Sequence, residues 1–321
     1  MKILVAGGCG YVGSALVPRL AERGYDVRVI DTLWFGNYLP KDTSIEKKDL
    51  FELCQQDLRG FDQVVFLAGL SNDPMAEFSP SLNFIHNAAA PAYLAYISKK
   101  AGVKRFVFAS TCSVYGYQED ALCTEQDPAV SSYPYGISKL QGERAVMQMA
   151  DSGFSVICLR KGTVCGHSPR MRFDLVVNTM FMTAMTEEVI RVYNPEIWRP
   201  ILSIQDAVSA YVRATEAAPH ISGVFNVASG NYTVGEIGDV VRDRLQELSG
   251  RQIRLLIEHR DEYRSYKVDI RNAMATLSFK PRHDVEAIVD DLWAHRSEYG
   301  DYAADEFYNI RIFRKLFPKA H

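Results

Sequence analysis

The chain has 321 residues, of which 47% are hydrophobic and 23% are charged, and its formal net charge is −3. This length and apolar content suffice for one large domain or for two unequal ones. The charge balance provides no basic field for nucleic acid, and no apolar run reaches the ~18 residues of a membrane span. We therefore expect neither a nucleic-acid partner nor a membrane partner.

Six cysteines are spread along the chain with no CxxC pair and no metal-ligand spacing: Cys9, Cys54, Cys112, Cys123, Cys158 and Cys165. This distribution predicts buried, reduced thiols in a cytoplasmic protein and no metal site. Residues 1–5 run directly into a glycine turn, so we expect no secretion signal there.

Short apolar runs alternate with helical patterns through the first half of the chain. The runs suit buried parallel strands and lie at residues 2–6, 27–30, 64–68, 106–109 and 155–159. Helical spacing is present at residues 14–23, about 80–101 and 134–150. The alternation predicts an α/β fold with a doubly wound, parallel, Rossmann-like sheet.

The pattern becomes less regular after Arg160. Residues 167–172 are rich in proline and arginine, and helical patterns return near 174–186, 204–217 and 234–248. We expect a domain over residues 1–162 that carries a dinucleotide and the catalytic residues. Residues 163–321 then form a smaller mixed α/β region for substrate, with some elements crossing back. We expect the tail over 301–321 to pack on the body of the protein, although it could also bind a partner.

The glycine turn between the first strand and the first helix is a candidate cofactor site. Gly7, Gly10 and Gly13 are spaced as GxxGxxG around Tyr11 and Val12. Small residues there let the backbone approach a pyrophosphate, and the helix N-terminus offers free N–H donors. Such a turn alone is weak evidence, because it can be purely structural.

Asp31 strengthens the interpretation, because it ends the second predicted strand about twenty residues further on. A carboxylate there accepts hydrogen bonds from the adenosine ribose and repels a 2′-phosphate, so NAD is favoured over NADP. Asp49 and Leu50 could flank the adenine, and Ala68 with Gly69 could pass under the pyrophosphate. Asp49 could equally be a helix cap, and Asp31 an ordinary turn residue.

Tyr135 and Lys139 are the candidate proton-transfer pair. Removal of a hydride from an alcohol carbon requires a base for the hydroxyl proton. A tyrosine has a pKa near 10, but a lysine four residues later lies on the same helix face, where its charge favours the phenolate. Thr111 could hold the substrate oxygen. Tyr133 is a weaker candidate, because Ile137 stands where its lysine would be.

The combination of motifs resembles the extended short-chain dehydrogenase/reductase family, in particular its NAD-dependent nucleotide-sugar epimerases and dehydratases. The resemblance covers nearly the whole chain and rests on the glycine turn, Tyr135, Lys139 and three further segments, at 66–69 (FLAG), 110–116 (STCSVYG) and 198–206 (WRPILSIQD). It implies bound NAD(H), a nucleoside-diphosphate-sugar substrate, and a homodimer packed through the helices near 80–101 and 134–150.

The resemblance also implies that the second half binds the nucleotide and diphosphate. Arginine suits this role, because its planar fork meets phosphate oxygens in pairs. Arg199 and Arg264 are the first candidates, although either could be a solvated surface residue. Further candidates are Arg170, Arg172 and Asn178. Asn87 could brace the catalytic segment or serve a structural role.

The reaction depends on the residues after Thr111. Dehydratases of this family usually carry Asp-Glu there, whereas this chain has Cys112 and Ser113. Cys112 is a tentative proton donor if its pKa is tuned, and otherwise a packing residue. His167 is another possible acid, or simply surface. Lys161 and Cys165 depart from the Asn and Tyr that are frequent in the family.

Without an added acid/base pair, the simplest chemistry is epimerisation at C4 through a transient 4-keto sugar. The alternatives are a dehydratase, a dehydrogenase, a keto-sugar reductase and, more remotely, a non-catalytic NAD-binding sensor.

Overall fold

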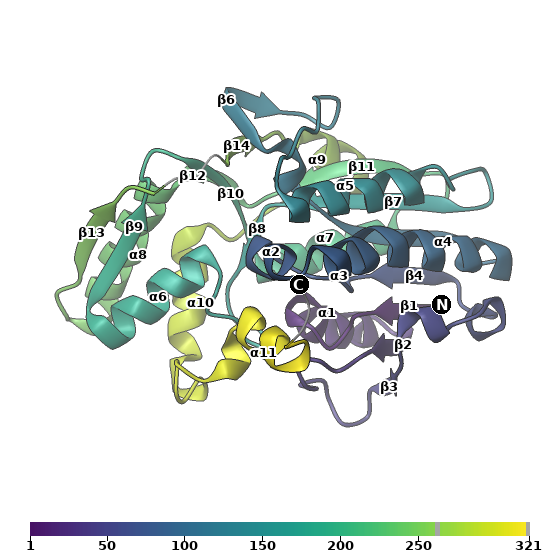
Figure 1. Cartoon of the computed structure of the whole chain (residues 1–321), viewed down its shortest axis with the longest axis horizontal. Coiled ribbons are helices and arrows are strands. Elements are labelled where there is room, and N and C mark those ends of the chain that lie inside the picture. Colours follow the sequence, from purple (N-terminus) through teal and green to yellow (C-terminus); the bar gives the residue numbers. More distant parts are fainter. Residues whose placement is uncertain (261–263, 319–321) are drawn as a thin grey trace.

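The computed structural model describes residues 1–260 and 264–318. A large sheet flanked by helices forms the main body, and a smaller region of strands and helices lies beside it at the left of Figure 1. No helix in the described ranges is long and apolar enough to cross a bilayer. All six cysteines are free thiols; five are buried as expected, whereas Cys54 is exposed.

The large sheet has seven strands, and every pairing in it is parallel. In spatial order the strands are β11 (Gly223–Val227), β7 (Ser155–Lys161), β5 (Arg105–Thr111), β4 (Gln63–Phe66), β1 (Lys2–Ala6), β2 (Asp26–Asp31) and β3 (Ser44–Lys47). The order reverses between β1 and β4, which places a crevice at their carboxyl ends, where sheets of this type bind ligands. The predicted doubly wound parallel sheet is confirmed.

Helices cover both faces of this sheet. They are α1 (Tyr11–Glu22) and α7 (Ile204–Glu216) on one face, and α2 (Asp73–Phe78), α3 (Pro80–Phe84), α4 (Ala90–Ala101) and α5 (Pro134–Met147) on the other. Alternate residues of β1 face the two layers: Ile3 and Val5 pack with α1 and α7, and Leu4 and Ala6 pack with α4. Burial on both faces explains why these strands are apolar throughout.

The prediction of a single helix over about 80–101 is wrong for the middle of that range. A π-helical turn over Ile85–Ala89 separates α3 from α4. Pro91 has no N–H to donate to the carbonyl of Asn87, which relaxes the regular spacing there. That carbonyl instead faces α5, and a Cβ on Gly142 would lie only 2.2 Å from it. The irregular turn therefore permits close packing against the helix of Tyr135 and Lys139.

Three smaller sheets and a second apolar core lie beside the large sheet. The second half of the chain supplies all strands of these sheets except the one over residues 117–123, which comes from the first half. Their strands are β8 (Thr163–Cys165), β10 (Trp198–Ser203) and β12 (Gly230–Thr233); β9 (Val189–Tyr193) and β13 (Arg254–Glu258); and β6 (Tyr117–Cys123) and β14 (Ser265–Val268). The helices are α6 (Val176–Glu187), α8 (Val234–Ser249), α9 (Arg271–Leu277), α10 (Val285–Ala294) and α11 (Asn309–Leu316). β11 and α7 belong to the large sheet layer, so the second half of the chain returns to the first.

A buried ion pair attaches α5, the helix of Tyr135 and Lys139, to the sheet. Arg160 at the end of β7 donates to both carboxylate oxygens of Glu143 on α5, at 2.6 and 3.0 Å, and their side chains are only 7% and 3% exposed. Ser110 of β5 donates to the same carboxylate at 2.6 Å, and Arg160 donates to Tyr115 at 2.8 Å. The charges are thus paired and hydrogen-bonded, as burial requires.

Removing one member of this pair is expected to be strongly destabilising. Glu143→Ala leaves the Arg160 charge buried without its carboxylate, which should reduce the free energy of unfolding by about 3–5 kcal/mol. Urea unfolding followed by circular dichroism measures this loss.

The matched control is Glu187→Ala, because Glu187 pairs with Arg191 at the same 2.6 Å but with side chains 45% and 38% exposed. That change should cost at most about 1 kcal/mol. Equal losses for the two variants would contradict a structural role for the buried pair.

Candidate active site

Two cavities meet at the carboxyl edge of the large sheet. The smaller, of about 90 Å³, lies between the glycine turn and the end of β2, and the larger, of about 410 Å³, opens toward the second half. Both are lined by Gly7, Gly10, Phe35, Leu67 and Gly69. The arrangement offers one continuous crevice for an extended ligand and a second ligand beside it.

The glycine turn fits a dinucleotide pyrophosphate. Gly7 has φ +80°, and a Cβ there would lie 2.5 Å from the backbone nitrogen of Ala68. A Cβ on Gly13 would lie 2.3 Å from the carbonyl of Gly8. Gly10 caps α1 without any side-chain hydrogen bond, so no side chain of the cap occupies the N–H groups of the first turn. These donors and the helix dipole suit an anion.

Asp31 stands at the end of β2 and lines the smaller cavity. Its two oxygens accept from the amides of Cys9 at 2.9 Å and Leu33 at 2.8 Å. Burial raises the pKa of Asp31, and these two bonds lower it. An ionised carboxylate has four acceptor positions, so it retains capacity for ribose hydroxyls.

Asp49 and Leu50, expected at the adenine, and Ala68 with Gly69, expected under the pyrophosphate, also line the smaller cavity. Asp49 is a helix cap as well, because its carboxylate accepts from the amide of Phe51 at 2.9 Å. Sequence reasoning missed the aromatic wall formed by Trp34, Phe35 and His86. These side chains are separated in sequence and carry no motif, so no local signal identified them.

Thr111, Tyr135 and Lys139 line the larger cavity together. Thr111 ends β5, and its hydroxyl accepts from the amide of Ser113 and donates to the Ser113 hydroxyl, both at 3.1 Å. Tyr135 and Lys139 project from successive turns of α5. The structure brings the three predicted catalytic residues to one cavity, which Gly7, Gly10 and Gly13 of the glycine turn also line.

Burial governs the charge states of this group. It raises the pKa of Tyr135, and Asp73 raises it further, while the Thr111 hydrogen bond and Arg172 lower it. Burial, followed by the charge of Lys161, lowers the pKa of Lys139 to about 7. The protein alone therefore keeps Tyr135 protonated, and the expected effect of Lys139 on the tyrosine does not dominate. Arg172 is an additional nearby cation that favours the phenolate.

Lys161 is a second lysine in the same cavity. It pairs in register with Thr111 across β5 and β7, and its ammonium lies 5.6 Å from the ring centre of Tyr211. Burial lowers the pKa of Lys161 to about 8. The sequence marked this position as unusual for the resembled family, and the structure places its charge near the proposed catalytic pair.

Two tentative acids do not line the cavity. Cys112 is fully buried, and its thiol donates to the carbonyl of Arg160 at 3.1 Å; burial raises its pKa further. His167 stacks on His295 with ring centres 3.7 Å apart and is within hydrogen-bond distance of Tyr299. These contacts favour packing and structural roles over proton donation to a ligand in the cavity.

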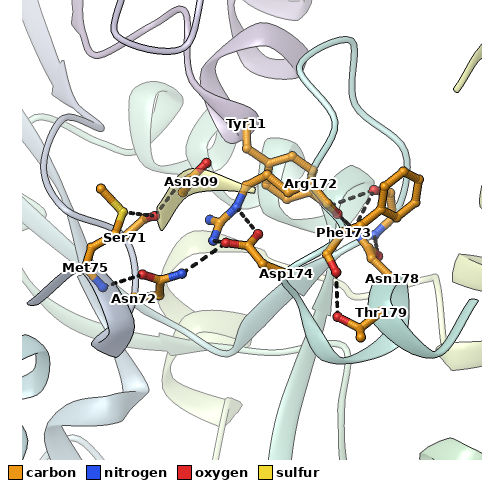
Figure 2. Close-up of polar contacts among 11 residues, drawn as sticks. Tyr11, Ser71, Asn72, Met75, Arg172, Phe173, Asp174, Asn178, Thr179 and Asn309 are labelled. Carbon is orange, nitrogen blue, oxygen red and sulfur yellow. Dashed lines mark hydrogen bonds and ion pairs between the residues drawn. The ribbon is translucent and has the colours of Figure 1, made fainter. Parts of the chain in front are cut away.

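Arg172 and its partners form a polar network beside the glycine turn (Figure 2). The guanidinium donates twice to Asp174, at 2.8 and 3.0 Å, and Asp174 accepts from Asn72 at 3.1 Å. Arg172, Asp174 and Asn72 all line the larger cavity. Sequence reasoning missed both Asn72 and Asp174, which are ordinary loop residues by pattern alone.

Asn178 lies behind this network (Figure 2), and its placement argues against the predicted substrate contact. It is fully buried, it accepts from the amide of Gly166 at 2.9 Å, and it donates to the carbonyl of Arg172 at 2.8 Å. Its amide also lies 3.2 Å from the Tyr11 hydroxyl. These bonds hold the loop over 166–172 in place, so Asn178 positions arginines and does not line the cavity.

Arg199 and Arg264 line the far side of the larger cavity, as predicted for residues that meet a diphosphate. Arg199 donates to the backbone carbonyls of Trp198 and Arg264. Arg264 forms an ion pair with Asp73 and lies over the ring of Tyr133. Asp73 was missed by sequence reasoning, although it is the carboxylate that raises the pKa of Tyr135.

The C-terminal helix α11 closes one side of the crevice. Asn309 and Ile310 line the larger cavity, and Asn309 donates to Ser71 at 2.8 Å. Phe313 packs between Trp34 and Phe78, so the tail rests on the first half of the chain (Figure 1). The expected packing therefore holds for the described part of the tail; residues 319–321 lie outside the described ranges. Within residues 1–260 and 264–318, no cluster of three or more metal-ligating side chains was found.

Known proteins are similar to this chain in sequence and in fold. The family model described as "NAD dependent epimerase/dehydratase family" matches residues 3–228. UDP-glucose 4-epimerase of Corynebacterium glutamicum is 28% identical over 94% of this chain and 97% of its own, and that of Streptomyces lividans is 27% identical over 93% and 97%.

Solved structures are similar over most of the chain, among them MoeE5 and TunA. MoeE5 in complex with UDP-glucuronic acid and NAD has a TM-score of 0.81 at 28% identity, covering 92% of this chain and 100% of the other. The NAD-dependent NDP-hexosamine 5,6-dehydratase TunA has a TM-score of 0.80 at 25% identity, covering 92% and 98%. The glycine turn, Asp31 and the Thr111–Tyr135–Lys139 wall thus lie in a matching sequence and fold, and the chain is an NAD-dependent enzyme that belongs to the NAD-dependent epimerase/dehydratase family.

Proposed function

We propose that the protein is a nucleotide-sugar 4-epimerase. The observation that carries the proposal is the wall of Thr111, Tyr135 and Lys139 in a cavity that continues into the glycine turn. Positions 112 and 113 supply no carboxylate, and the Cys112 thiol is buried away from the cavity. The residues therefore support proton transfer at one hydroxyl, which is what inversion of a single alcohol carbon requires.

In this proposal the Thr111 hydroxyl holds the C4 oxygen, and Tyr135 takes its proton and later returns it. NAD, when bound, accepts the C4 hydride and gives it back. Lys139 and Arg172 provide positive charge that stabilises the phenolate of Tyr135. Burial of the group keeps water away from the transient ketone. The sugar must present its other face between the two hydride transfers, so the cavity has to permit it to turn.

Arg199 and Arg264 are proposed to bind the diphosphate, and the region over 163–321 to hold the nucleotide. Relatives called UDP-glucose 4-epimerase and the UDP-glucuronic acid complex of MoeE5 support a uridine nucleotide. The division at residue 162 remains part of this proposal.

We also infer a homodimer through α4, α5 and the π-helical turn, where Ile85 and Tyr96 are 41% and 54% exposed. A cytoplasmic location agrees with the free thiols.

A dehydratase is the second candidate, and Asp73 is the observation that favours it. This carboxylate lines the cavity close enough to Tyr135 to raise its pKa. It could move a proton at a carbon beside the ketone. Its ion pair with Arg264 favours a binding role instead.

A panel of nucleotide sugars separates these reactions. Incubation of the enzyme with UDP-hexoses in deuterated water should give C4 inversion with no carbon-bound deuterium and no net NADH. Nuclear magnetic resonance and absorbance at 340 nm read these outcomes separately. Loss of water together with deuterium at C5 or C6 would overturn the epimerase proposal in favour of the dehydratase.

Tyr135→Phe removes the hydroxyl and keeps the ring. Turnover should fall by roughly 10²–10⁴-fold, while UDP-sugar affinity measured by calorimetry stays near the parent value. Tyr133→Phe is the matched control, because it removes a hydroxyl two residues away that does not line the cavity. Near-normal turnover in Tyr135→Phe would show that another group is the base.

Asp31 should set the preference for NAD. On cofactor-free protein, NAD should bind more tightly than NADP by at least ~10-fold, equivalent to ~1.4 kcal/mol. Asp31→Asn removes the repulsion toward a 2′-phosphate and should narrow that ratio, whereas Asp26→Asn at the exposed start of β2 should not. Equal affinity of the parent protein for both cofactors would contradict the role given to Asp31.

A further inference from the structure

Arg170 has a buried guanidinium that lacks partners for two of its three nitrogens. The residue is 1% exposed, and neither Nε nor Nη2 has a hydrogen-bond partner within the described residues. Its guanidinium carbon lies 4.5 Å from the ring centre of Phe35. Burial, followed by the charge of Arg172, lowers the pKa of Arg170 to about 10, so the group is still charged at neutral pH.

Arg172, in the same loop, has the hydrogen-bond partners that the Arg170 guanidinium lacks. Its guanidinium donates twice to Asp174, at 2.8 and 3.0 Å. Asp174 and Glu306 act on Arg170 only through space, without a hydrogen bond. A buried charge without such bonds is unfavourable, so an anion that accepts hydrogen bonds from the Arg170 guanidinium is bound more tightly.

The position of Arg170 identifies the anion it would meet. Its amide donates to the Ser14 hydroxyl at 3.2 Å, and the neighbouring Ser168 hydroxyl donates to the carbonyl of Tyr11 at 2.6 Å. Ser14 and Ser168 are also within 2.9 Å of each other. These bonds attach the loop of the second half directly to the first turns of α1, whose N-terminus is the pyrophosphate site.

The residues that line the cavities also place Arg170 beside the glycine turn. Arg170 borders the larger cavity together with Gly7, Gly10 and Gly13, and Phe35 beneath its guanidinium borders both cavities. The glycine turn over residues 7–13 contains no cationic side chain of its own. Arg199 and Arg264, the candidates for the substrate diphosphate, come instead from β10 and from the residue before β14.

We propose that Arg170 binds the pyrophosphate of NAD and provides, from the second half of the chain, the positive charge that the glycine turn lacks. The loop over 166–172 would then join the two sites, because Arg170 holds the cofactor while Arg172 borders the cavity of the substrate. The inference rests on NAD dependence alone, and it holds whether the sugar reaction is epimerisation or dehydration.

Calorimetry on cofactor-free protein tests the assignment with four probes: NAD, ADP, adenosine and UDP. Arg170→Met keeps the apolar length and removes the charge. NAD and ADP should bind about 10–100-fold more weakly, which is the range for charge-assisted hydrogen bonds, whereas adenosine and UDP should change less than about 3-fold. ADP binding is assigned to the cofactor site only if NAD displaces the bound ADP.

Three outcomes would overturn the proposal: unchanged NAD affinity, an equal loss for adenosine and ADP, or a loss confined to UDP. The last would assign Arg170 to the substrate diphosphate. A failed sugar reaction has no bearing on these measurements, so they can fail independently of the proposed function.

Thermal unfolding provides a second readout. Without ligand, Arg170→Met should unfold at the parent temperature or above, because an uncompensated charge is gone, and its stabilisation by NAD should shrink. Arg172→Met is the matched control and should unfold at a lower temperature, because it removes the cation that pairs with Asp174 and leaves that carboxylate, among the described residues, only the hydrogen bond from Asn72. A lowered midpoint for Arg170→Met with unchanged stabilisation by NAD would show a purely structural role.

Should Arg170→Met fail to fold, Arg170→Lys retains the charge with fewer donors. It should weaken NAD and ADP while leaving adenosine unchanged, and parental NAD affinity in that variant would reject the proposal.

Discussion

The buried pair of Glu143 and Arg160 holds α5, the helix of Tyr135 and Lys139, on the sheet. Arg160 is the penultimate residue of β7, Glu143 lies one turn after Lys139 on α5, and Ser110 of β5 donates to the same carboxylate as Arg160. One carboxylate therefore joins the three elements that carry the proposed catalytic groups. Because the residue after Ser110 is Thr111 and the residue after Arg160 is Lys161, the pair also sets the positions of those two side chains.

The electrostatics of the site follow from its burial. Six cationic side chains and the carboxylates of Asp73 and Asp174 line the larger cavity, so it carries net positive charge in a protein whose net charge is −3; the cations are Lys139, Lys161, Arg170, Arg172, Arg199 and Arg264. Burial lowers the pKa of Lys139 to about 7 and that of Lys161 to about 8, while it raises the pKa of Tyr135. Such opposed shifts are typical of functional sites, and an anionic ligand would relieve the repulsion among the cations.

Local patterns were sufficient for much of the fold and for part of the site. The strands and the glycine turn follow from short apolar runs and small residues, and Tyr135 with Lys139 follows from helix periodicity. Pro91 interrupts the helix spacing locally, but the packing of the Asn87 carbonyl against Gly142 joins two distant segments, which no local window contains.

The remaining site residues depend on contacts between distant segments. Asp73 meets Arg264, and Asn309 reaches Ser71, across 191 and 238 residues. An asparagine near Arg170 and Arg172 in the sequence suggests ligand binding at Asn178. In the structure, the Asn178 side chain instead forms hydrogen bonds with the backbone of the loop over 166–172.

The central claim is that the hydride removed from C4 returns to C4 of the same sugar. UDP-hexoses carrying deuterium at C4 test it most directly, with the products analysed by nuclear magnetic resonance and mass spectrometry. The account predicts C4 epimers that retain deuterium at C4 in ordinary water. Epimers with hydrogen at C4, label transferred to another carbon, or dehydrated products without any C4 epimer would contradict it.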